Sequence, residues 1–180
     1  MSEQIFTVGH SNQLLDRFAA LLAQHRVETL VDIRRFPGSK KFPHFNQSNL
    51  EAALREAGVE YIWMEALGGR RHTAAGEGSV NTGLRNEGFR HYADYMLTGE
   101  FREAIDSLLK IAGRKRTVIM CAEAVFWRCH RRLVSDFLVA SGHTVQHIMP
   151  AGQLHPHELT AGAVAKGAVV TYPGQGSLFK

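Results

Sequence analysis

Short apolar runs alternate with amphipathic stretches along most of the chain, and this alternation is the feature that most limits its possible folds. The apolar runs predict five strands, at 5–8, 29–33, 61–64, 117–120 and 145–148. Apolar residues at helical spacing predict helices around 14–22, 48–57, 89–96, 101–112 and 129–140. We therefore expect an α/β fold, a mainly parallel sheet of about five strands with helices on both faces.

The boundaries of the second predicted helix carry the clearest local signals. Ser48 followed by Glu51 fits a capping box at its start, and Gly58 fits its end. No repeat or linker divides the chain, so we expect one domain over 1–172 and a flexible C-terminal tail over 173–180. The glycine-rich loop from Gly68 to Gly88 is too long for a simple connector and is typical of a lid, a binding loop or a disordered segment.

Composition narrows the class of protein. The chain has 180 residues, of which 44% are hydrophobic and 21% charged, as in an ordinary globular domain. No stretch approaches the length of a membrane span, and the polar start of the chain does not resemble a signal peptide. We therefore expect a cytoplasmic protein without a membrane partner. In that compartment Cys121 and Cys129 are expected to be free thiols, ligands or catalytic groups rather than a structural disulfide.

The formal net charge of +4 is modest, but the basic residues are clustered. Such clusters are either solvated surface or a surface for phosphate or nucleic acid, and charge alone does not decide between the two. The clusters are Arg34-Arg35, Lys40-Lys41, Arg70-Arg71, Arg114-Lys115-Arg116 and Arg128 with Arg131-Arg132.

The segment 120–132 is the most reactive part of the chain. It contains both cysteines, Glu123, His130 and three arginines, between a predicted strand and a predicted helix. Ligands of α/β proteins bind beyond the carboxyl ends of the strands. A thiol beside arginines and a helix N-terminus has its thiolate favoured. This segment is therefore predicted to be the centre of a site for an anionic ligand.

Polar residues follow the first four predicted strands at the point where each ends. A parallel sheet brings these strand ends to one edge, so the residues are expected to meet there. They are His10 and Ser11, then Asp32, Arg34 and Arg35, then Glu65, Gly68, Gly69 and Arg70, and finally Cys121 and Glu123.

Each of these residues also has a purely structural interpretation. Asp32 either caps a backbone turn or pairs with an arginine and orients it. His10 is either a turn histidine or an acid–base group. Gly68 and Gly69 either supply positive φ angles or let the backbone approach a phosphate.

A metal site is a weaker alternative. Cys121-Ala122-Glu123 resembles part of the zinc deaminase signature, which also needs a P-C-x-x-C turn that this chain lacks. Cys121, Cys129 and His130 with a distant histidine are the remaining candidate ligands. If 121–129 were helical, the two sulfurs would lie about 12 Å apart, so only an irregular turn would bring them together. Cys129 and His130 are otherwise a buried thiol and a structural histidine.

Taken together in order along the chain, six motifs resemble the family of the domain of unknown function 488. The resemblance runs from about Phe6 to Ile148 and implies a compact bacterial or archaeal α/β domain with a site, without implying a reaction or a cofactor. The motifs are Gly9-His10-Ser11, Val31-Asp32-Ile33-Arg34 with Pro37, Leu67-Gly68-Gly69, Cys121-Ala122-Glu123, Cys129-His130-Arg131 and Val145-Gln146-His147-Ile148.

The C-terminal tail carries a second resemblance. Gln175, Leu178 and Phe179 are spaced as in the short peptide by which bacterial DNA-processing proteins dock on the replication sliding clamp. Peptide docking favours an exposed chain end with two apolar anchors. The alternative is that Leu178 and Phe179 fold back onto the domain.

Three functional hypotheses follow. The first is an enzyme acting on a nucleic acid or nucleotide. The second is a non-catalytic module that binds a nucleotide or DNA and docks on a replication or repair partner. The third is a metal or thiol-redox protein. In the first hypothesis Cys121 or Cys129 is the nucleophile or ligand. Glu123 with His10 or His130 moves protons, and Asp32 belongs to the catalytic group. The residues expected to bind phosphate are Ser11, Arg34, Arg35, Gly68, Gly69, Arg70 and Arg131.

Overall fold

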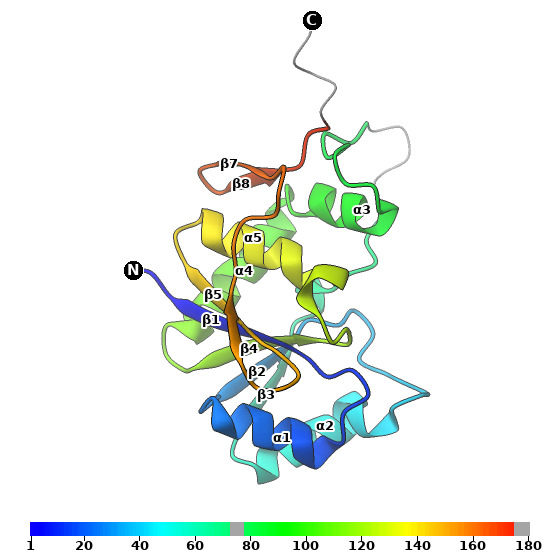
Figure 1. Cartoon of the computed structure of the whole chain (residues 1–180), viewed down its shortest axis with the longest axis vertical. Coiled ribbons are helices and arrows are strands. Elements are labelled where there is room, and N and C mark those ends of the chain that lie inside the picture. The colour runs from blue at the N-terminus through cyan, green and yellow to red at the C-terminus, as the bar shows by residue number, and fades with distance from the viewer. Residues whose placement is uncertain (73–77, 175–180) are drawn as a thin grey trace, which may run out of the picture.

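A six-stranded, mainly parallel sheet forms the centre of the computed structural model, which describes residues 1–72 and 78–174 (Figure 1). The strand order is β3-β2-β4-β1-β5-β6, and only β6 is antiparallel to its neighbour. All five predicted strands form, so the expected α/β fold is confirmed. The strands are β1 Gln4–Gly9, β2 Thr29–Asp32, β3 Glu60–Trp63, β4 Thr117–Cys121, β5 Thr144–Ile148 and β6 Leu154–Pro156.

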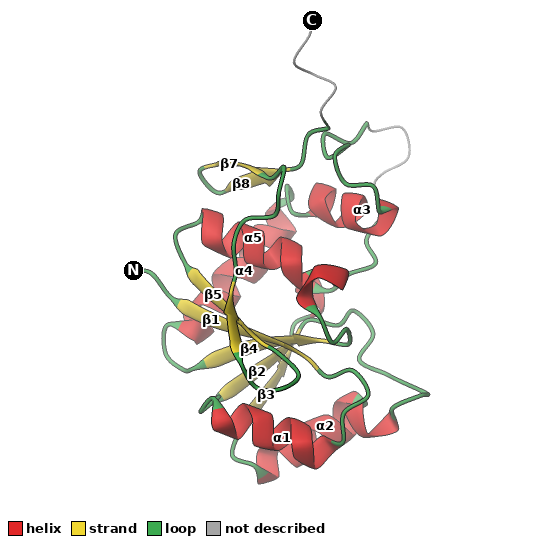
Figure 2. Cartoon of the chain, viewed as in Figure 1, coloured by secondary structure: helices red, strands yellow, loops and turns green. Residues whose placement is uncertain are grey.

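Helices cover both faces of the sheet, as the alternation predicted (Figure 2). One face is covered by α1 (Leu15–Gln24) and α2 (Gln47–Glu56). The other is covered by α4 (Gly99–Ala112) and α5 (Arg131–Ala140), with α3 (Glu87–Tyr95) beside them. No helix in the described residues is both long and apolar enough to cross a membrane.

Two hydrophobic cores lie on the two faces because side chains alternate along each strand. In β4, Val118 and Met120 pack toward α1 and α2, whereas Ile119 and Cys121 pack toward α4 and α5. Every residue of β4 is buried, as expected for a central strand of a parallel sheet with both faces covered.

The start of α2 differs from the prediction. The helix begins at Gln47, so Ser48 is already inside it and the capping box is not formed. Asn46 occupies the cap position, and its side-chain oxygen accepts a hydrogen bond from the Ser39 backbone instead. The predicted end of the helix is confirmed, because Gly58 has a φ of +74°.

The C-terminal part contains three short strands that the sequence pattern did not predict. Each has only three residues, too few for a periodic signal. Besides β6 they are β7 (Val164–Lys166) and β8 (Val169–Thr171), which form a hairpin against α5. Val170 and Tyr172 are buried in the core, so the single domain extends to this point. The predicted docking residues Gln175, Leu178 and Phe179 lie outside the described residues.

The order of the strands places a site at one edge of the sheet. β1 and β4 are neighbours, but the chain leaves β1 toward α1 on one face and leaves β4 toward α5 on the other. Such a reversal opens a crevice beyond the carboxyl ends of the two strands. The crevice lies between His10-Ser11 and the residues that follow Cys121.

Candidate functional site

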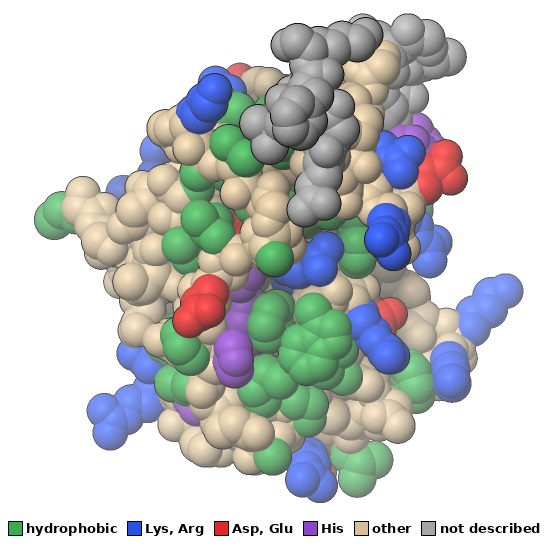
Figure 3. Space-filling view, turned by 45° about the horizontal axis from the view of Figure 1, so that its top comes forward, with side chains coloured by type: hydrophobic (Ala, Val, Ile, Leu, Met, Phe, Trp, Pro, Cys, Tyr) green, Lys and Arg blue, Asp and Glu red, His purple; other side chains and the backbone are tan. Residues whose placement is uncertain are grey.

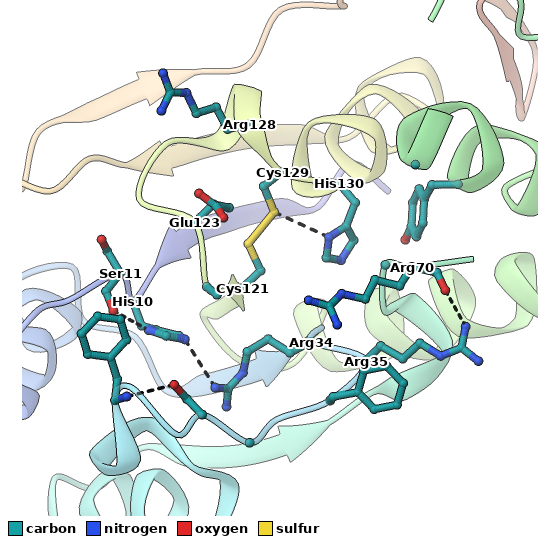
Figure 4. Close-up of a pocket in the computed structure, with 18 of the residues that line it drawn as sticks. His10, Ser11, Arg34, Arg35, Arg70, Cys121, Glu123, Arg128, Cys129 and His130 are labelled. Atoms are coloured by element: carbon teal, nitrogen blue, oxygen red, sulfur yellow. Dashed lines mark hydrogen bonds between the residues drawn. A yellow bond between two sulfur atoms is a disulfide. The ribbon is translucent and has the colours of Figure 1, made fainter. Parts of the chain in front are cut away.

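A cavity of about 910 Å³ occupies this crevice, at the carboxyl ends of β1, β2 and β4. Figure 3 shows one face of the molecule, on which lysine and arginine side chains lie around hydrophobic ones. Of the described residues that line the cavity, five are basic and one is acidic. They are Arg34, Arg35, Lys41, Arg70 and Arg128, with Glu123. Arg34 and Arg70 project into the cavity, whereas Arg128 points away from it (Figure 4).

Asp32 lies beneath the cavity and forms a buried ion pair with Arg34. The Asp32 carboxylate accepts from Arg34 Nη2 at 2.6 Å and Nε at 2.9 Å, from the Arg34 backbone N–H and from the Tyr61 hydroxyl at 2.6 Å. Arg34 also donates to the Phe45 carbonyl. Asp32 is fully buried and does not line the cavity. Its contacts match both interpretations, because Oδ1 caps the turn through the Arg34 backbone N–H while both oxygens hold the Arg34 guanidinium.

His10 is held as a neutral acceptor. Its Nδ1 lies 2.9 Å from the Ser11 carbonyl oxygen, which can only accept, so Nδ1 carries the proton. Nε2 is then bare and faces Arg34 Nη1 at 3.4 Å. Burial lowers the pKa of His10 to about 4, so the ring is uncharged near neutral pH. The arginine already occupies the lone pair that a general base would use.

The two cysteines meet in a disulfide on the floor of the cavity, with Cα atoms 7.6 Å apart (Figure 4). The expectation of free thiols is therefore wrong for this form of the protein. The turn from 122 to 130 is irregular and contains only the short 3-10 helix η3 (Phe126–Arg128), so it folds Cys129 back onto Cys121. The predicted strand-to-helix turn is present, but α5 begins at Arg131 rather than near Cys129.

The possible metal site at Cys121, Cys129 and His130 is not formed. Sulfurs that are bonded to each other are not thiolate ligands. Within 1–72 and 78–174, no group of three or more histidine, cysteine, aspartate or glutamate side chains is arranged to hold a metal.

His130 faces the sulfur of Cys129 with an unprotonated nitrogen. Its Nε2 lies 3.0 Å from the Ile33 carbonyl oxygen and must carry the proton, which leaves Nδ1 bare at 3.6 Å from Cys129 Sγ. The backbone N–H of Arg131 donates to the same sulfur at 3.4 Å. Burial lowers the pKa of His130 to about 4. The sulfur of Cys129 therefore has both a proton acceptor and an N–H donor beside it.

Arg131 holds the cysteine turn from behind instead of facing the cavity. It is 1% exposed, and it donates to the Glu123 carbonyl at 2.7 Å and to the Thr7 hydroxyl at 3.3 Å. Burial lowers the pKa of Arg131 to about 9. Its predicted contact with phosphate does not fit this position, because its guanidinium lies beneath the turn. The Glu123 residue itself is exposed at the cavity rim.

The two predicted phosphate-binding glycines serve close packing between protein groups. A Cβ on Gly68 would lie 2.7 Å from the Arg35 Cα, and one on Gly69 would lie 3.1 Å from His130 Nδ1. Neither has a positive φ, so that part of the prediction is wrong. The left-handed residues at the cavity are instead Arg70 (φ 54°) and Ser11 (φ 49°). Strain of this kind in residues with side chains gathers at functional sites.

A buried polar network behind the turn was not predicted from the residues. It runs from Tyr172 through Asp136, His157 and His147 to Thr7, where it meets Arg131. The successive distances are Tyr172 Oη–Asp136 Oδ2 2.6 Å, Asp136 Oδ1–His157 Nε2 2.8 Å, His157 Nδ1–His147 Nε2 2.9 Å and His147 Nδ1–Thr7 Oγ1 2.6 Å. Of its members only His147 lies in a motif that carries the family resemblance, because residues this far apart in sequence give no shared local signal.

Asp136 accepts from the Tyr172 hydroxyl and from His157. A proton arrangement that fits the remaining contacts has His157 accepting from His147 and His147 accepting from the Thr7 hydroxyl. Burial lowers the pKa of His147 to about 2. The network links the C-terminal segment to the turn that carries Glu123 and Cys129.

Comparison with known proteins gives one result. The family model described as domain of unknown function DUF488 matches residues 14–138, from just before α1 to near the end of α5. Comparisons with curated proteins and with solved structures found no match. The matched region includes Asp32, Arg34, both cysteines and His130.

Proposed function

Because the chain belongs to the DUF488 family, whose description names no reaction, we propose its function from the cavity: an enzyme that acts on a nucleotide or nucleic acid. The phosphate of the substrate binds Arg34 and Arg70. The reduced thiol of Cys129 is the nucleophile, and His130 is its base. The observation that carries the proposal is the cation-lined cavity that opens onto Cys129 and His130.

The electrostatics of the cavity favour an anion. Five basic residues and one acidic residue line its described part, and a cleft lined mainly by one sign of charge concentrates ligands of the opposite sign. Asp32 neutralises much of the charge of Arg34. Arg70, Lys41 and Arg128 make no ion pair among the described residues, and of Arg70 and Arg128 only Arg70 points inward (Figure 4). We therefore assign the phosphate contact to Arg70.

The size and the aromatic lining favour a nucleotide unit over a small inorganic anion. A volume of about 910 Å³ lies in the range of sites for cofactors and substrates. Phe36, Phe42 and Phe89 line the cavity, and Phe36 is 63% exposed. Exposed aromatic rings beside basic residues stack on nucleobases.

The chemistry requires the reduced form of the cysteine pair. We place the protein in the cytoplasm, where such pairs are kept reduced. His130 Nδ1 then accepts the proton of the Cys129 thiol, and the Arg131 N–H stabilises the thiolate. Glu123, at the rim, is the second proton-transfer group of the proposal.

Binding is tested by thermal unfolding of the reduced protein with ADP or inorganic phosphate at low ionic strength. We expect ADP to raise the melting temperature and salt to weaken the effect. Arg70→Ala should weaken ADP binding at least about tenfold, the equivalent of one charge-assisted hydrogen bond. Arg55→Ala is the control, because Arg55 is exposed on α2 and its only ion pair among the described residues is with Glu51. If millimolar ADP stabilises neither the wild type nor the two variants, the proposal is wrong.

A second measurement separates an enzyme from a non-catalytic module. An activated Cys129 should react with iodoacetamide quickly near neutral pH, and Cys129→Ser should lose that fast phase. If ADP binds but both cysteines react as ordinary thiols, the protein is a binding module and the catalytic part of the proposal fails.

A further inference from the structure

The two sulfurs of the disulfide have different surroundings. Cys129 Sγ lies beside His130 Nδ1 and accepts the Arg131 N–H at the start of α5. Cys121 ends β4, packs in the core toward α4 and α5, and has no hydrogen bond to its sulfur among the described residues. The groups that favour a thiolate therefore act on Cys129 and not on Cys121.

His130 is fixed in the tautomer that can accept a proton from Cys129. Its donor to the Ile33 carbonyl sets the tautomer, and Gly69 leaves room for the ring. Tyr92 packs against the same ring at 5.0 Å between centroids. A neutral ring with a bare Nδ1 toward the sulfur can take a proton from a thiol but cannot give one to it.

We infer that Cys129 is the attacking thiol and Cys121 the resolving thiol of a dithiol couple that reduces small hydroperoxides, and that the resulting disulfide blocks the active site proposed above. Only the statement that the disulfide blocks the active site rests on the proposed function. The assignment of the two thiols stands on their own surroundings.

The reaction balances with a hydroperoxide as the two-electron oxidant. His130 takes the proton of Cys129, and the thiolate attacks the terminal oxygen of ROOH, which breaks the O–O bond and releases ROH after protonation. Cys129 is now a sulfenic acid. The Cys121 thiol attacks its sulfur, the S–S bond forms and water leaves. A small dithiol that can enter the cavity restores both thiols by exchange and leaves as its own disulfide.

The burial of the sulfurs selects the size of the oxidant. Cys121 is 3% exposed and Cys129 is 5% exposed, on the floor of the cavity. A disulfide on the surface of another protein cannot reach an attacking sulfur at this depth. Hydrogen peroxide and small organic hydroperoxides can enter the cavity.

The assignment is tested on the fully reduced protein with hydrogen peroxide and dimedone, which traps sulfenic acid, followed by mass spectrometry. We expect the wild type to form the disulfide without a trapped adduct. Cys121→Ser should accumulate the adduct on Cys129, and Cys129→Ser should form little or none. An adduct mainly on Cys121 in Cys129→Ser, with none on Cys129 in Cys121→Ser, reverses the assignment. If peroxide produces neither the disulfide nor a dimedone adduct, the inference of a dithiol couple is wrong.

His130 has its own test. His130→Gln should slow the reaction of Cys129 with peroxide near neutral pH at least about tenfold, because a positioned base contributes this much or more. The difference should shrink as the pH rises and the thiol ionises without help, which a purely structural effect would not produce. His91→Gln is the control, because His91 pairs only loosely with Glu87 on α3. Equal rates in the two variants contradict the role of His130.

The blocking of the site is tested separately. In the oxidised wild type neither sulfur should react with iodoacetamide, and the protein should regain the fast reaction after treatment with dithiothreitol. If ADP fails to stabilise even the reduced protein while Cys129 still forms sulfenic acid, the proposed function fails and the dithiol couple stands. If ADP stabilises the reduced protein but peroxide produces no disulfide, only the dithiol couple fails.

Discussion

At the scale of single residues, buried partners position the groups that face the cavity. Asp32 receives five hydrogen bonds, four from Arg34 and one from Tyr61. Asp32→Asn removes the charge and leaves Arg34 buried without its counter-ion, so we expect a loss of about 3–5 kcal/mol of folding free energy. Tyr61→Phe should cost only about 1 kcal/mol, the net value of one hydrogen bond. Urea unfolding measures both, and equal losses would contradict this account of the pair.

Gly9 gives a second prediction at this scale. A Cβ at this position would lie 1.7 Å from the Glu123 carbonyl oxygen, which Arg131 holds in place. We expect Gly9→Ala to lower stability by about 2 kcal/mol or more, because the backbone must move to relieve the overlap. Gly38→Ala is the matched control, since no atom lies within 4 Å of its added Cβ. Similar melting temperatures for the two variants would contradict this prediction, because the backbone at Glu123 would then move at little cost in free energy.

At the scale of elements, three buried histidines on β5 and on the turns that follow β1 and β4 make stability depend on pH. Burial lowers the pKa of His10 and His130 to about 4 and that of His147 to about 2, whereas unfolded histidines titrate near 6.5. Between pH 6.5 and about 4 the unfolded chain therefore binds more protons than the folded one. Stability should be complete above pH 6.5 and should fall as the pH drops through this window.

Urea unfolding at pH 7, 6 and 5 tests this prediction, because most carboxylates remain ionised over that range. His10→Gln should make the decline shallower by removing one of the three groups. A free energy of unfolding that does not change between pH 7 and 5 would mean that these histidines are protonated in the folded protein.

The elements also show how far the sequence can be interpreted alone. Strands β1 to β5 were predictable because each is an apolar run of four or more residues between turn signals. The three-residue strands β6, β7 and β8 were not, because they carry no periodic pattern. The capping box failed at Ser48 because the preceding 3-10 helix (Pro43–Phe45) lets the helix begin earlier. Local signals of this kind are overridden by the chain that precedes them.

At the scale of the whole molecule, the parallel sheet explains why motifs distant in sequence line one cavity. His10, Arg34, Arg70, Cys121 and Glu123 line it together because their strand ends share one edge. Whether a given side chain lines the cavity or lies beneath it was not predictable in the same way. Asp32 and Arg131 lie beneath the cavity, since the direction of a side chain depends on register and packing. Contact between the cysteines depends on the irregular turn 122–130, which no periodicity describes.

The tail gives a prediction about partners. We propose that Gln175, Leu178 and Phe179 dock on the bacterial sliding clamp. Two apolar anchors contribute roughly 3–6 kcal/mol on full burial, so Leu178→Ala with Phe179→Ala should abolish detectable binding of the full chain to the purified clamp. Equal binding by the wild type and the double variant, or none by either, removes the clamp from the proposal.

The central claim is that the phosphate site and the reactive thiol belong to one cavity. The most direct measurement is the rate at which iodoacetamide modifies Cys129 in the reduced protein, near neutral pH, with and without saturating ADP. We predict fast modification of Cys129 without ADP, slow modification of Cys121, and strong protection of Cys129 by ADP that is lost in Arg70→Ala. Bound ADP that leaves the rate at Cys129 unchanged would place the two functions in separate parts of the molecule and contradict the account.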